Sequence, residues 1–81
     1  MNTQLDLLET VIAIANFPEH QVLAGDVGAV VEVYARPDLA YDVEFVNPDG
    51  TTRALLTLAP DQVRRLSSAD VLTTRQMALA A

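Results

Sequence analysis

The chain contains no cysteine and no lysine, and its 81 residues include a single histidine. The absence of cysteine excludes disulfides and thiolate metal sites as supports for the core. The absence of lysine leaves five arginines against eleven acidic residues, so the net charge is −6. Proteins that bind nucleic acid need basic side chains to displace phosphate counterions, and the only basic cluster here is Arg64 with Arg65. Binding to nucleic acid or to an anionic membrane is therefore not expected, whereas a protein partner with a basic surface is favoured.

Long apolar runs are also missing. The longest runs, such as residues 11–15, are far too short to cross a bilayer, which requires about 20 residues. No positive charge precedes an apolar run near the N-terminus, so a secretory signal is not expected and a cytoplasmic location is the default. Hydrophobic residues nevertheless make up 51% of the chain, which is enough for the packed core of one small domain.

What the chain does have is a series of β-prone segments separated by turn residues. Strands are expected over residues 10–15, 28–35, 41–46, 53–58 and 63–66. Pro60 favours one short 3₁₀ turn between the last two strands. The sequence therefore predicts an all-β domain, a small SH3-like five-stranded antiparallel barrel over residues 1–66. The remaining segment, residues 67–81, is predicted to be a frayed helix or disordered.

The alternation of residue types assigns side chains to the two faces of these strands. In residues 41–46, alternation predicts Tyr41, Val43 and Phe45 in the core, with Asp42 and Glu44 toward water. Ala54, Leu56 and Leu58 are likewise predicted to point inward, and Leu55 outward.

In residues 28–35 the alternation is only partial. A regular strand would place Val31 and Val33 on one face, and Val30, Glu32 and Tyr34 on the other.

Residues 47–50, Asn-Pro-Asp-Gly, form a strong turn signal. Proline fits the second position of a type I turn, Asp49 follows it, and Gly50 tolerates a left-handed backbone. If Asn47 and Gly50 close this loop, Glu44 lies opposite Arg53 on the solvent face.

A connection without clear periodicity covers residues 16–26. Pro18 interrupts the first strand because it lacks a backbone N–H. Gly25 and Gly28, with Asp26 between them, are predicted to supply backbone conformations or close approaches that a Cβ would hinder. A phosphate-binding loop is not favoured, because a strand and not a helix follows Gly28.

His20 permits two interpretations. With Glu19 and Asp26 it could be a metal ligand or the general base of metal-assisted hydrolysis. Alternatively, it is a structural residue of the loop whose ring bonds a backbone carbonyl. The second interpretation is favoured, because a metal site needs three or four converging ligands. No catalytic residue, metal or cofactor is therefore expected, and the protein is predicted not to be an enzyme.

The candidate partner-binding residues are Glu32, Tyr34, Arg36, Asp42 and Glu44. The three carboxylates are expected to share one barrel face. They could form a cation site or an acidic docking surface, or simply a solvated strand face. Tyr34 and Tyr41 flank the loop 36–40, and aromatic side chains near a loop mouth of SH3-like barrels can form a peptide groove. Tyr41 is assigned to the core, and Tyr34 is expected to be partly exposed.

Five motifs follow one another along the chain: Pro-Glu-His (18–20), Gly-Asp-Val-Gly-x-Val-Val-Glu-Val-Tyr (25–34), Tyr-Asp-Val-Glu-Phe-Val (41–46), Asp-Gly (49–50) and Ala-Leu-Leu-Thr-Leu (54–58). In this order they resemble the pattern of a bacterial family of short proteins of unknown function with an SH3-like barrel. The resemblance covers roughly residues 8–66 and implies the fold but no established activity. Such proteins are often encoded beside small uncharacterised genes, some of toxin–antitoxin or toxin–immunity type. The resemblance thus implies an accessory or antitoxin/immunity-type partner of a neighbouring gene product.

Two further possibilities follow from the strands themselves. A structural homo-oligomer could form by pairing of an exposed edge strand, either residues 10–15 or residues 51–58. A weaker likeness to the KOW element would imply an RNA- or ribosome-associated barrel, although the basic residues that hold RNA are missing.

Overall fold

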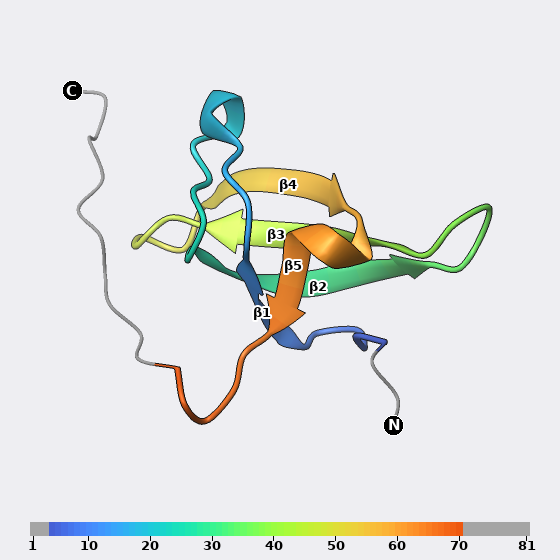
Figure 1. Cartoon of the computed structure of the whole chain (residues 1–81). Helices are drawn as coiled ribbons and strands as arrows, with labels where there is room; N and C mark the ends of the chain where they lie inside the picture. Colours follow the sequence, from blue (N-terminus) through green and yellow to red (C-terminus); the bar gives the residue numbers. More distant parts are fainter. Residues whose placement is uncertain (1–3, 71–81) are drawn as a thin grey trace.

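The computed structural model describes residues 4–70 and consists of one five-stranded antiparallel sheet (Figure 1). The strands are β1 (Thr10–Ala13), β2 (Val27–Tyr34), β3 (Ala40–Val46), β4 (Thr52–Leu58) and β5 (Val63–Arg65), in the spatial order β4-β3-β2-β1-β5. Within residues 4–70 the only helical elements are two 3₁₀ turns, η1 (Pro18–His20) and η2 (Pro60–Gln62). The all-β prediction with five antiparallel strands is confirmed. None of the helical elements described is long and apolar enough to span a membrane.

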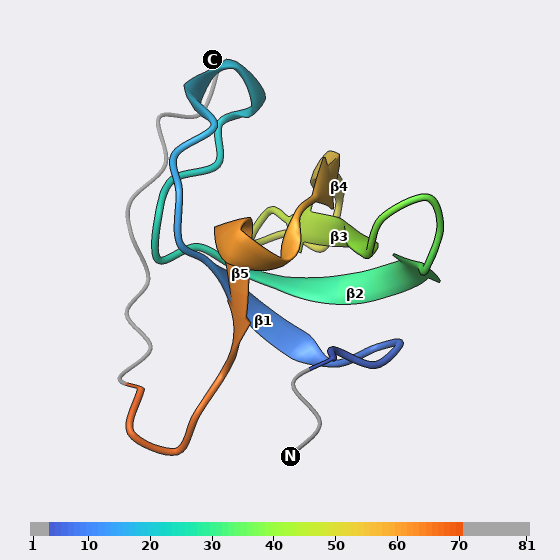
Figure 2. The ribbon, with the colours of Figure 1, turned by 45° about the vertical axis from the view of Figure 1, so that its right-hand side comes forward.

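The sheet is strongly bent. Figures 1 and 2 show β1 and β5 side by side, crossing the direction of β3 and β4 steeply, with the long β2 shared by both parts. Because β1 pairs with both β2 and β5, it is an interior strand. Its three consecutive residues Val11, Ile12 and Ala13 are all buried, which explains why this segment lacks alternation. The strand ends two residues earlier than predicted, and it cannot be the open edge that residues 10–15 were expected to offer.

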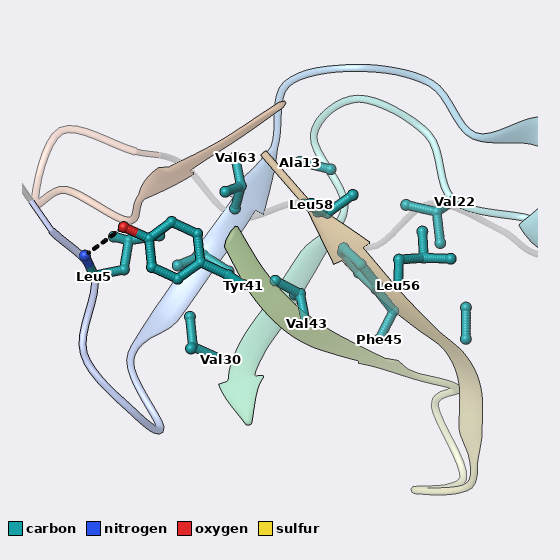
Figure 3. Packing of buried hydrophobic residues seen from close by; sticks show 12 residues of the cluster. Leu5, Ala13, Val22, Val30, Tyr41, Val43, Phe45, Leu56, Leu58 and Val63 are labelled. Atoms are coloured by element: carbon teal, nitrogen blue, oxygen red, sulfur yellow. Dashed lines mark hydrogen bonds between the residues drawn. The ribbon is translucent and has the colours of Figure 1, made fainter. Parts of the chain in front are cut away.

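The core fills the concave side of this bent sheet. Tyr41, Val43 and Phe45 are buried, as predicted, and they pack with residues from every other strand (Figure 3). The hydroxyl of Tyr41 accepts a hydrogen bond from the backbone N–H of Leu5 at 3.1 Å, which ties the N-terminal segment to the core. Burial of each of these large side chains contributes about 1.5–3 kcal/mol.

A β-bulge in β2 changes which side chains face the core. Val30 pairs with Val43 and Glu32 pairs with Asp42, so Val31 has no cross-strand partner. Val30 is buried, Val31 is exposed and Val33 packs against the core. The predicted grouping of Val31 with Val33, opposite Val30, is therefore wrong, because the extra residue reverses the alternation.

A second register shift lies beside the turn between β3 and β4. Gly50 donates its N–H to the Asn47 carbonyl at 2.9 Å and has a φ of +89°, so the predicted turn is present. However, Ala54 pairs with Phe45 and Thr52 with Val46, which leaves Arg53 as the extra residue. The predicted pairing of Glu44 with Arg53 is therefore wrong.

In the tail predicted over residues 67–81, the part beyond Asp70 lies outside the described residues. Ser67 donates its backbone N–H to the Asp70 carboxylate at 2.6 Å.

Candidate functional site: an acidic face on β2 and β3

The connection before β2 places the predicted turn residues as structural elements. Pro18 begins η1, and His20 ends it with its side chain exposed. The backbone N–H groups of His20 and Gln21 bond the carbonyls of Phe17 and Pro18, at 3.0 and 3.1 Å. Within residues 4–70 the predicted bond from the His20 ring to a backbone carbonyl is not found, and backbone hydrogen bonds hold the turn. The described residues contain no group of three His, Asp or Glu side chains placed to hold a metal ion.

The Gly25–Gly28 segment contains a buried ion pair that the sequence does not predict. The Asp26 carboxylate accepts the Leu23 N–H at 3.0 Å and lies 3.4 Å from the Arg53 guanidinium. The side chains of Arg53 and Asp26 are only 8% and 9% exposed. The bulge in β4 turns Arg53 inward to reach this carboxylate, so the pair fixes the connection against the start of β4.

Gly25 and Gly28 serve different purposes in this segment. Gly25 has a φ of +96°, which favours glycine. A Cβ on Gly28 would lie 2.7 Å from Cγ1 of Val43 and 2.9 Å from the Glu44 carbonyl oxygen. Gly28 therefore allows β2 to approach β3 closely.

Ion pairs with arginine neutralise several carboxylates away from the central strands. Arg64 binds Asp70 at 2.7 Å, and this hydrogen bond holds the pKa of Asp70 far below its usual range. Arg65 forms an ion pair with Glu9, whose hydrogen bond lowers the pKa of Glu9. Arg64 and Arg65, the only basic cluster in the sequence, thus each form a defined ion pair.

The predicted carboxylates Glu32, Asp42 and Glu44 lie together on the outer side of β2 and β3, and we call them the acidic face. Glu32 is directly opposite Asp42 across the two strands, and Glu44 follows two residues after Asp42 on β3. Within residues 4–70, no arginine forms an ion pair with any of the three. Like charges opposite each other on a sheet are destabilising, so this arrangement costs the fold free energy.

Neutral hydroxyl groups orient the acidic face. Asp42 accepts hydrogen bonds from the Tyr34 hydroxyl at 2.7 Å and from Thr57 Oγ1 at 2.5 Å. Glu44 accepts one from Thr52 Oγ1 at 2.7 Å. A carboxylate offers about four acceptor sites, so both groups can accept further hydrogen bonds.

The acidic face raises the pKa of Tyr34, the tyrosine beside it. The hydrogen bond to Asp42 raises the pKa of Tyr34, and desolvation and the negative charges of Asp42 and Glu32 raise it further. Of the two tyrosines that flank the loop 36–40, Tyr34 therefore contacts the acidic face through Asp42, whereas Tyr41 is buried in the core. Arg36 is exposed in the loop after β2, and within residues 4–70 no hydrogen bond or ion pair joins it to the acidic face.

Asp49 has a purely local role. Its Oδ1 accepts hydrogen bonds from the N–H and the hydroxyl of Thr51, at 3.0 and 2.6 Å. These bonds lower the pKa of Asp49 and stabilise the turn that Gly50 ends. Asp49 is thus a turn residue, as predicted.

Leu55 is the apolar neighbour of the acidic face. It lies opposite Glu44 on β4 and is 59% exposed, in agreement with its predicted outward orientation. The hydroxyl partners Thr52 and Thr57 come from the same strand, and sequence reasoning did not identify them as part of the site.

A family model described as "Domain of unknown function (DUF4926)" matches residues 7–65. No curated protein and no solved structure matches the chain significantly. The matched residues extend from the turn before β1 to the end of β5 and cover well over half of the chain. The protein therefore belongs to the DUF4926 family of domains of unknown function.

Proposed function

We propose that the protein is a non-enzymatic protein-binding module whose acidic face docks a partner with a basic surface. One observation carries the proposal. Glu9, Asp26 and Asp70 are each neutralised by an arginine, whereas hydroxyl groups orient Asp42 and Glu44 without neutralising them. A rigid, oriented set of anions is suited to basic side chains of a partner.

The architecture supports the same proposal. The order β4-β3-β2-β1-β5, with the long β2 shared by both parts of the sheet, supports the inference of an SH3-like barrel, a fold that can serve as a binding module. The acidic face lies on two paired strands, which hold a binding surface more precisely than loops do. An accessory, antitoxin-like or immunity-like relationship to a neighbouring gene product is the partner class that the family resemblance implies.

Electrostatics distinguishes this proposal from RNA binding. The outer side of β2 and β3 presents Glu32, Asp42 and Glu44 where a KOW-like barrel would need basic residues. The field of a chain with net charge −6 accelerates encounter with a cationic partner and weakens as salt is added.

The test is a pull-down of the tagged protein from its native host at moderate salt, with quantitative mass spectrometry. The informative variant combines Glu32→Gln with Glu44→Gln. The matched control combines Glu19→Gln with Asp61→Asn, which removes the same number of charges from exposed positions on η1 and η2. We expect a stoichiometric protein that the first variant loses and the control retains. Equal recovery with both variants would contradict the proposal.

A further inference from the structure

One edge of the sheet is open beside the acidic face. β4 is the last strand on its side, and its register with β3 runs from Ala54 opposite Phe45 to Leu58 opposite Tyr41. In the part of the chain that the structure describes, no strand pairs with the other side of residues 54–58. Figure 1 shows β4 along the rim of the sheet, beyond β3. We propose that this edge binds an extended basic segment of a partner protein as an added strand. This inference rests on the proposed function and specifies its mode of binding.

The edge is protected only at its beginning. Natural sheets block open edges with bulges, prolines or inward-pointing charges. The bulge and the inward-pointing Arg53 provide this protection at the start of β4. Residues 54–58, Ala-Leu-Leu-Thr-Leu, contain no proline, no glycine and no charge. The backbone of this half of β4 is therefore suited to pair with a further strand.

The acidic face selects the charge of the outward side chains on such a strand. Asp42 lies opposite Thr57, and Glu44 lies opposite Leu55. An added strand would lie about 10 Å from β3, twice the spacing between neighbouring strands. An arginine opposite Thr57 can extend over this short side chain toward Asp42. An arginine opposite Leu55 can lay its aliphatic stem on the leucine and direct its guanidinium to Glu44.

The inward side chains of the added strand meet a different environment. Leu56 and Leu58 point into the core and are buried. Side chains next to them at the rim of the core should be apolar. The structure thus specifies an alternating segment, with basic residues outward and apolar residues inward.

A second copy of the chain fits this edge less well. Pairing β4 with β4 would bring together two molecules of net charge −6. The second β4 would supply no outward cation, because its only charge, Arg53, points inward to Asp26. A basic strand from another protein complements the acidic face, whereas a second copy repeats it.

The probe is a short capped peptide that alternates valine and arginine, studied by NMR titration of the full chain. We expect amide shifts concentrated on residues 54–58 and on the two neighbouring strands. A peptide of the same composition, with its arginines and valines in separate blocks, should bind about tenfold more weakly. Glu44→Gln should weaken binding of the alternating peptide severalfold, and the exposed control Glu19→Gln should not.

Backbone methylation separates strand addition from binding by side chains alone. Successive N–H groups of a strand point to opposite edges, so two peptides are compared, methylated either on the valine or on the arginine nitrogens. Strand addition requires that one of the two loses binding and the other retains it.

Three results would overturn the inference. If both methylated peptides bind as well as the parent while Glu44→Gln weakens all three, basic side chains bind without strand addition, and the proposed function stands. If the alternating peptide does not bind at about 1 mM, strand addition is wrong, and the pull-down decides the proposed function separately. If sedimentation shows a dimer in which the amides of β4 are protected from exchange, a second copy occupies the edge.

Discussion

At the scale of single residues, Leu8 has an unusual backbone for an aliphatic side chain. It has a φ of +66° and is 79% exposed, at the tip of a turn closed by the hydrogen bond from the Glu9 N–H to the Asp6 carbonyl. A left-handed conformation costs an L-residue roughly 1–2 kcal/mol. Since the side chain is mostly in water, little burial offsets this cost.

Leu8→Asn should therefore stabilise the protein by about 0.5–1 kcal/mol, because asparagine tolerates the left-handed region. Urea denaturation measures the change in the free energy of unfolding. The neighbouring Leu7→Asn serves as the control, since Leu7 is also exposed but has no positive φ. Equal effects of the two substitutions would show that the backbone of Leu8 is not strained.

Gly28 represents the opposite case, in which a side chain is absent because a neighbouring strand occupies its place. Gly28→Val should destabilise the fold by about 1–3 kcal/mol or more, because its Cβ would overlap a backbone carbonyl oxygen of β3 that cannot move without displacing the strand. Ala29→Val, at the next and half-buried position, should change stability by less than about 0.5 kcal/mol. If Gly28→Val and Ala29→Val shift the denaturation midpoint by the same amount, the close approach of β2 to β3 is contradicted.

At the scale of elements, an ion pair connects the segment before β1 to β5. Glu9 accepts hydrogen bonds from Arg65, which also donates to the Gln4 carbonyl. Since the folded state lowers the pKa of Glu9, the unfolded chain binds the proton more readily. The stabilisation is therefore present above the usual glutamate pKa of about 4.3 and is lost as the pH falls through the lower, folded-state value.

Glu9→Gln should accordingly lower the melting temperature at pH 7, and the difference from the parent protein should shrink below about pH 4. Thermal unfolding followed by circular dichroism at several pH values measures both effects. Glu19→Gln, at an exposed position without an ion pair in residues 4–70, should leave the melting temperature unchanged at every pH. If the melting temperature of Glu9→Gln stays below that of the parent protein in acid, the changed shape of the side chain, and not its lost charge, lowers the stability.

Elements also show what the sequence could and could not predict. Alternation within 41–46 correctly assigned the core residues of β3 and the outward carboxylates Asp42 and Glu44. The bulges at Val31 and Arg53 could not be predicted, because each depends on how two strands pair and not on the pattern of one strand. Either Val30 or Val31 could face a core by composition alone, and only the pairing with Val43 decides between them.

The same reason explains what was missed at the candidate site. Thr57 and Thr52 reach their carboxylates from a different strand, so their contribution depends on the register of β4. The Arg53–Asp26 ion pair joins residues that are distant in the sequence and requires the bulge.

At the scale of the whole molecule, carboxylates in ion pairs with arginine and the carboxylates of the acidic face lie in different places. Within residues 4–70, three of the arginines form ion pairs with carboxylates, and none of these pairs includes the acidic face. Part of the excess negative charge of the chain therefore lies on the outward surface of its central strands. Composition alone gave the sign of the charge, and the strand pairing determines its location.

The position of β1 between β2 and β5 has a consequence for biosynthesis. β1 leaves the ribosome before the other four strands of this sheet, yet Val11 and Ile12 obtain their second set of backbone partners only from Arg65 and Arg64. Contacts between such distant residues form late and slowly. A nascent chain that has emerged only as far as β4 still presents the apolar strand β1 with one open side, available to chaperones and proteases. Emergence of the next seven residues, which end with β5 (Val63–Arg65), then completes the sheet.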